Sequence, residues 1–129
     1  MDYLSIEEVV ALHVKTMTAN GQSADVLSMA KLEAAVHRPQ SGAFGEEAFP
    51  TFSLKAAALL HGLISAHAFL DGNKRIGLVA TMAFLQLNGF TQFPAEEELY
   101  VLTMAIAAGE LRDLEPIAQQ LRALFGLPD

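Results

Sequence analysis

The sequence contains no cysteine and no tryptophan, and only eight of its 129 residues are lysine or arginine. Without cysteine the chain has neither a disulfide framework nor a thiolate site, which fits a cytoplasmic protein. The formal net charge is −7. A chain with so few cations lacks the basic clusters that bind a phosphate backbone, so we expect no nucleic-acid partner.

Long apolar runs are also missing from the sequence. The two most apolar stretches, residues 56–70 and 76–90, are shorter than the roughly 20 residues that a membrane span requires. No basic start followed by an apolar run indicates a secretory signal. We therefore expect a soluble, cytoplasmic protein that does not associate with a membrane.

Hydrophobic residues make up 52% of the chain and charged residues 18%, which excludes disorder as the default. The length predicts a single domain over residues 1–129. No segment shows convincing strand alternation, and the pattern predicts an all-α bundle with the apolar helix 73–88 at its centre. Apolar residues recur at helical spacing in about six segments, near 5–19, 28–37, 53–67, 73–88, 96–109 and 113–126.

Local signals predict where several helices begin and which residues face inward. Ser5 opens the first helix with the spacing of a capping box, and Ser28 and Ser53 are expected to cap the second and third helices. Met29 is expected to face the core. His13 lies on the apolar stripe of the first helix, which predicts a core histidine whose polar atoms are satisfied.

The most unusual stretch is His-Ala-Phe-Leu-Asp-Gly-Asn-Lys-Arg at residues 67–75, called the motif loop below, which places polar groups between two apolar segments. Such groups are costly to keep unless they have a task. Gly72 and Asn73 predict a helix entry with Asn73 as N-cap, whose free N–H groups would bind an anion, phosphate above all. Lys74 and Arg75 oppose the usual preference for acids in a first helical turn, as expected where a ligand supplies negative charge.

His67 and Asp71 add an acid–base group and a carboxylate to this turn. Histidine exchanges protons near neutral pH, which suits a general base, and a single carboxylate can hold Mg²⁺ that is also bound to phosphates. Each residue alone has a simpler interpretation, as a structural histidine, a turn residue or a solvated cation. Their four-residue spacing would also suit a transition metal if the helix continued, but the turn ends it. Together they indicate phosphoryl or nucleotidyl transfer.

The motif loop resembles the signature of the Fic/Doc family, His-x-Phe-x-(Asp/Glu)-Gly-Asn-x-Arg, and in particular its Doc (death-on-curing) branch. Lys74 is the Doc-like feature, because the AMP-transferring Fic branch typically has glycine there and a second arginine where this chain has Leu78. Segments elsewhere, such as Tyr3-Leu4 and Leu87-Asn88-Gly89, are also similar to Doc chains, so the resemblance covers nearly the whole chain. The matching motif residues are His67, Phe69, Asp71, Gly72, Asn73 and Arg75.

The resemblance implies an all-α Fic/Doc fold and a toxin-type kinase that arrests growth. Such an enzyme transfers phosphate from a nucleoside triphosphate such as ATP, bound with Mg²⁺, to a Ser or Thr hydroxyl of a translation factor such as an elongation factor. His67 would then be the catalytic base on the target hydroxyl, and Asp71 the Mg²⁺ ligand. The phosphates would be held by Gly72, Asn73, Lys74 and Arg75.

The chain departs from the family pattern at two places. It reads Leu27-Ser28-Met29-Ala30 where family members often have an Arg-Asp-x-Gly-like run, and Val79 where some have a polar residue. The orientation of the nucleotide therefore stays open. Two alternatives remain, a protein AMP-transferase of the Fic type and a catalytically silent protein-binding module.

Residues 38–52, called the flap segment below, form the one long irregular stretch, and loops of this length are often functional. In the family the corresponding segment lays the target beside the active site. Phe44 and Phe49 would either contact the target or tuck into the core. Many Fic-type enzymes are restrained by a helix carrying Ser/Thr-x-x-x-Glu, and no Ser or Thr here has Glu four residues later. We therefore expect a separate antitoxin whose tail binds the domain, while a homodimer stays open.

Overall fold

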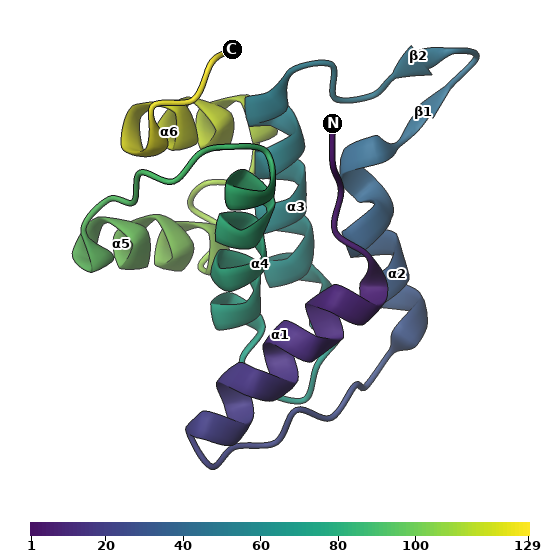
Figure 1. The fold of residues 1–129 in the computed structure, drawn as a ribbon, viewed down its shortest axis with the longest axis vertical. Helices are drawn as coiled ribbons and strands as arrows, with labels where there is room; N and C mark the ends of the chain where they lie inside the picture. The colour runs from purple at the N-terminus through teal and green to yellow at the C-terminus, as the bar shows by residue number, and fades with distance from the viewer.

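The computed structural model describes residues 1–129 as six α-helices with one short hairpin (Figure 1), which confirms the all-α prediction. The two strands are antiparallel and pair Gly42 with Glu47 and Ala43 with Glu46. None of the helices combines the length and hydropathy needed to cross a bilayer. The elements are α1 (Ile6–Ala19), α2 (Met29–His37), the 3₁₀ turn η1 (Arg38–Gln40), β1 (Gly42–Ala43), β2 (Glu46–Glu47), α3 (Phe52–Ala66), α4 (Asn73–Leu87), α5 (Glu96–Ala107) and α6 (Leu114–Phe125).

The helix at the centre of the bundle is α3, so the expectation that residues 73–88 hold this place is wrong. Eleven of the 15 residues of α3 are buried, whereas six of the 15 in α4 are. The helices α2, α4 and α6 all pack against α3 (Figure 1). Ala56, Ala57 and Ala58 are fully buried, and their small side chains let neighbouring helices approach on several sides.

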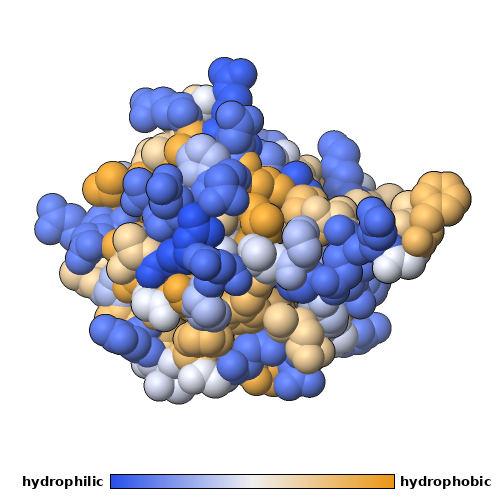
Figure 2. Space-filling model, turned by 90° about the horizontal axis from the view of Figure 1, so that it is seen from above, coloured by the Kyte–Doolittle hydropathy of each residue, from blue (hydrophilic) through white to orange (hydrophobic).

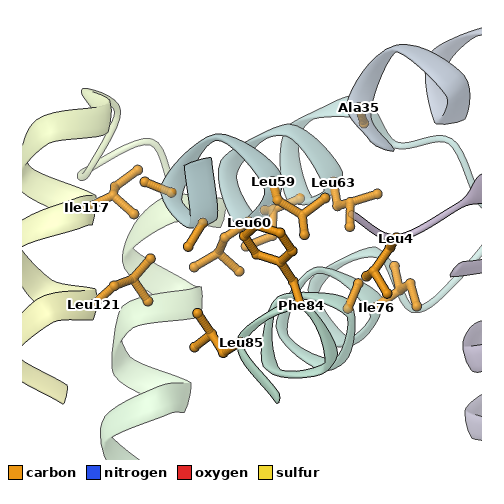
Figure 3. Packing of buried hydrophobic residues seen from close by; sticks show 14 of the residues in the cluster. Leu4, Ala35, Leu59, Leu60, Leu63, Ile76, Phe84, Leu85, Ile117 and Leu121 are labelled. Atoms are coloured by element: carbon orange, nitrogen blue, oxygen red, sulfur yellow. The ribbon is translucent and has the colours of Figure 1, made fainter. Parts of the chain in front are cut away.

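The hydrophobic core joins α3 to α4 on one side and to α6 on the other. Figure 3 shows Leu60 of α3 beside Phe84 of α4, with Ile117 and Leu121 of α6 on the opposite side. Leu60 is fully buried, and burial of a leucine contributes about 1.5–3 kcal/mol of transfer free energy. Because α3 and α4 are held side by side, the segment between them is also held at both of its ends.

The predicted starts of the first two helices are confirmed. The amide of Glu8 donates to Ser5 Oγ at 3.1 Å, and the amide of Ser5 donates to Glu8 Oε1 at 2.9 Å, which completes the capping box. Ser28 caps α2 through the amide of Lys31. Met29 was expected to face inward, but it is 47% exposed, because it lies in the first turn beyond the reach of the core.

The predicted cap of the third helix is wrong by two residues. Thr51 caps α3, and its Oγ1 accepts from the amide of Leu54 at 3.2 Å. Ser53 instead lies fully buried inside the first turn, where its Oγ accepts from Arg122 of α6 at 2.9 Å. Both residues are suitable caps in sequence, and the contact with α6 decides between them.

The flap segment contains η1 and the β1–β2 hairpin, and Lys55 fastens its base to α3. Lys55 is only 3% exposed, and its Nζ donates to Glu47 at 3.1 Å and to the carbonyl of Phe49. The ring of Phe49 is half-buried under the guanidinium of Arg38, at 5.7 Å.

The tip of the hairpin exposes an aromatic side chain completely. Phe44 is 104% exposed and has a φ of 54°, so the interpretation that it tucks into the core is wrong. Figure 2 shows an apolar projection at one edge of the molecule, on the side where Figure 1 places the hairpin. The hairpin thus presents an apolar group with no partner inside the chain.

Candidate active site

The motif loop begins where α3 ends, as the sequence predicts. His67 is the C-terminal cap of α3 and has a left-handed backbone with φ 48° and ψ 45°. Such a conformation costs a non-glycine residue about 1 kcal/mol or more, and strain of this kind concentrates at functional sites. The side chain of His67 is exposed and makes no hydrogen bond within the chain, so it is available to a ligand.

The next residues of the loop are fixed by the segment that precedes α2. The amide of Leu70 donates to the carbonyl of Asp25 at 2.9 Å. The amides of Leu27 and Ser28 both donate to the carbonyl of Ala68, at 2.8 and 3.1 Å. These backbone contacts join residues about forty positions apart in the sequence, and no side-chain pattern before α2 predicts them.

The side chain of Asn73 ties the loop to the start of α4. Its Nδ2 donates to the carbonyl of Phe69 at 2.9 Å, and its Oδ1 accepts from the amide of Phe69 at 3.1 Å. The prediction that Asn73 is the N-cap is therefore wrong, since Gly72 occupies that position with φ 76° and no side-chain cap bond forms. The amide side chain of Asn73 is used to hold the loop, which leaves its backbone N–H for a ligand.

The start of α4 is positively charged and open to solvent. Lys74 and Arg75 are exposed and take part in none of the ion pairs of the structure. The first helical hydrogen bond runs from the amide of Ile76 to the carbonyl of Gly72, so the preceding amides point freely out of the helix end. Free amides, the helix dipole and two cations together make this end of α4 chemically suited to an anion.

Asp71 lies at the same helix end and is exposed. Its Oδ1 accepts from the amide of Gly72 at 2.8 Å. No group of three His, Cys, Asp or Glu side chains is close enough to hold a metal ion. A Mg²⁺ here would therefore have one protein carboxylate and take its other ligands from phosphates and water, which is the usual arrangement for this ion on a nucleotide.

A pocket of about 310 Å³ opens beside His67, between the end of α3 and the turn after α5. His61 and Ser65 of α3 and Arg112 after α5 line it together with His67. Its volume is at the lower end of the range for small-molecule sites. The structure thus adds Arg112, which has no ion-pair partner, to the surroundings of His67. The sequence contains no signal for this, because 45 residues separate the two.

The contacts of His61 fix its tautomer. Nη1 of Arg38 lies 3.0 Å from Nδ1, and arginine can only donate, so Nδ1 accepts and Nε2 carries the proton. Nε2 lies 3.4 Å from Oγ of Ser65. Burial, followed by the charge of Arg38, lowers the pKa of His61, which keeps the ring neutral.

The sequence profile of the Fic/DOC family matches residues 3–85, which include α1 to α3, the motif loop and most of α4. The chain belongs to the Fic/Doc family. Toxin Doc of Mycolicibacterium smegmatis is 41% identical over 88 residues, which are 68% of this chain and 65% of that protein. Protein kinase doc of Escherichia phage P1 is 32% identical over 126 residues, 98% of each chain. These relatives confirm the resemblance to the Doc branch.

Replacing Asn73 with alanine is expected to destabilise the protein by about 1–3 kcal/mol, because both backbone polar groups of the buried Phe69 lose their partners. Urea denaturation measures this change. Asn20→Ala is the matched control, because Asn20 makes a single exposed side-chain bond to Thr16, and a loss within about 0.5 kcal/mol is expected. Equal losses in the two variants would show that Asn73 does not hold the loop.

Proposed function

We propose that this protein is a Doc-type toxin that transfers the γ-phosphate of ATP, bound with Mg²⁺, to a Ser or Thr hydroxyl of a translation factor. The observation that carries the proposal is the motif loop, which joins the exposed His67 at the end of α3 to a free, positively charged helix end at the start of α4. The names of the two relatives, a Toxin Doc and a Protein kinase doc, support the same activity. A translation factor as target would place this activity in the cytoplasm.

The resemblance to the Fic/Doc family supports a role for each polar residue of the loop. His67 would remove the proton of the target hydroxyl, whose oxygen then attacks the γ-phosphorus while the bond to the β-phosphate oxygen breaks and ADP leaves. The phosphates would approach the open backbone at Gly72 and be held by the free amide of Asn73 and the side chains of Lys74 and Arg75. Asp71 would hold Mg²⁺, which when bound would supply positive charge against the phosphates.

Two features of the chain favour phosphate transfer over AMP transfer. Lys74 provides a cation where the AMP-transferring branch has glycine, and Leu78 replaces the second arginine of that branch. Leu78 packs against the core, so it offers no charge to a phosphate. With one cationic pair at the helix end, we expect the γ-phosphate to be the group presented to the target.

A labelling assay tests the reaction directly. The protein is incubated with Mg²⁺, a bacterial lysate and ATP that carries its label on either the γ- or the α-phosphate. We expect a protein band labelled only from the γ position. His67→Asn should lower this labelling by about 10²–10⁴-fold without loss of stability, because asparagine tolerates the left-handed backbone.

His37→Asn is the control for that assay, because His37 is another exposed histidine at the end of a helix. It should keep full activity. A label that comes only from the α position would identify an AMP-transferase. If neither label appears and calorimetry detects no binding of Mg²⁺-ATP, the protein is a silent binding module.

The flap segment offers a contact surface for the protein target. The ring of Phe44 is fully exposed at the hairpin tip, and Lys55 anchors the base of the hairpin to α3. We expect Phe44→Asn to raise the KM for the target band several-fold, while kcat and the unfolding temperature stay unchanged. The control is Tyr100, an exposed aromatic residue of α5. Figure 1 shows α5 on the opposite side of the molecule from the hairpin, so Tyr100→Gln should leave the KM unchanged. An unchanged KM for Phe44→Asn would remove the hairpin from target binding.

The activity of a toxin has to be restrained, and this sequence lacks the restraining Ser/Thr-x-x-x-Glu pattern. We propose that a separate antitoxin supplies the restraint by binding the domain with its tail. Induced expression of the protein alone is expected to stop bacterial growth, and expression of His67→Asn is not. Unimpaired growth with a wild-type protein that still transfers phosphate in vitro would contradict this prediction.

A further inference from the structure

His13 of α1 is buried directly beneath the motif loop. It is 1% exposed, and its ring centroid lies 3.8 Å from that of Phe69, with the two planes inclined by 32°. A Cβ atom at Gly72 would lie 3.0 Å from Cε1 of His13 and 2.6 Å from Sδ of Met17. The imidazole therefore contacts the loop at both Phe69 and Gly72.

The hydrogen bonding of His13 is incomplete, contrary to the expectation of a satisfied core histidine. Its Nε2 is buried and has no hydrogen-bond partner. An unpaired buried polar atom costs about 1–3 kcal/mol, and leucine has nearly the volume of histidine without this cost. The neighbouring buried positions of the same helix, Val9 and Met17, are apolar. Stability alone would thus favour an apolar residue at position 13.

Asp71 is the charged residue that acts on the ring of His13. Burial lowers the pKa of His13, and the backbone and the carboxylate charge of Asp71 oppose this shift. The ring is therefore neutral at neutral pH and lies next to the Asp71 peptide. Asp71, the proposed metal ligand, is connected to the start of α4 through Gly72.

We infer that His13 is a positioning residue, which holds the Asp71–Gly72 peptide in the conformation that the site requires. Asn73 fixes the loop at Phe69 from the side of α4, and His13 supports the same loop from the side of α1. The carboxylate of Asp71, which accepts from the amide of Gly72, is then held at the start of α4. This inference rests on the proposed function, in which Asp71 binds Mg²⁺.

The test compares His13→Leu, His13→Gln and Met17→Leu. The first replaces the flat ring by a branched apolar chain, the second keeps a flat group of similar length, and the third places the same leucine at the adjacent buried position that also touches Gly72. We expect His13→Leu to unfold at the same or a higher urea concentration. Its transfer of γ-phosphate should nevertheless need about tenfold more Mg²⁺ for half-maximal rate, a typical loss when a group that orients a metal ligand is removed.

His13→Gln is expected to recover most of the Mg²⁺ affinity, because its flat amide can take the place of the ring against Phe69 and Gly72, and Met17→Leu is expected to retain it. A folded His13→Leu with wild-type Mg²⁺ dependence would overturn the inference. If His13→Leu does not fold, His13→Gln and His13→Asn provide the comparison, because the shorter amide of asparagine cannot reach the loop. Equal Mg²⁺ dependence in these two variants would also overturn it.

Hydrogen exchange separates this inference from the proposed function. Without nucleotide, the hydrogen-bonded amides of Phe69 and Leu70 should exchange about tenfold faster in His13→Leu than in Met17→Leu, which corresponds to about 1.4 kcal/mol of local opening. If the wild-type protein transfers no phosphate, the proposed function fails. The hydrogen-exchange measurement would still test whether His13 holds the loop. Equal exchange in the two variants would show that His13 does not hold the loop.

Discussion

The two hydrogen bonds between the side chain of Asn73 and the backbone of Phe69 are the interaction on which the candidate site depends. Phe69 is buried, so its amide and carbonyl need partners, and the loop offers none from a regular ladder. The asparagine amide supplies a donor and an acceptor in one group and so replaces a strand neighbour. This closes the turn between α3 and α4 and sets where the first free amides of α4 point.

The site separates the groups that hold the loop from those that remain for a ligand. The groups that hold the loop are buried and engaged in packing or hydrogen bonding, namely Phe69, His13 and the backbone of Ala68. Only Nε2 of His13 has no hydrogen-bond partner among them. His67 and Lys74, by contrast, are exposed and unpaired. The core between α3 and α4 supports this division, because two helices fixed along their length hold the ends of a short loop rigidly.

Sequence reasoning succeeded where the signal is local. The helix ends at Ser5 and Ser28 follow from hydrogen bonds within one helical turn, and the break after α3 follows from the residues of the turn itself. It failed where two nearby residues are equally suitable for the same structural position. Ser53 and Thr51 can both cap α3, and the buried bond from Arg122 takes Ser53 out of that competition. Both α3 and α4 carry apolar residues over much of their length, and the packing shows that α3 is the helix that is surrounded.

The sequence by itself determined the all-α class and the chemical groups of the motif loop, because helical periodicity and motif spacing are properties of neighbouring residues. The tertiary structure alone decided how those groups are used. It directs the amide of Asn73 back to Phe69, it brings the segment before α2 to Ala68, and it places His13 under Asp71 and Gly72. These contacts join residues far apart in the chain through single backbone or ring atoms, and such contacts have no period in the sequence.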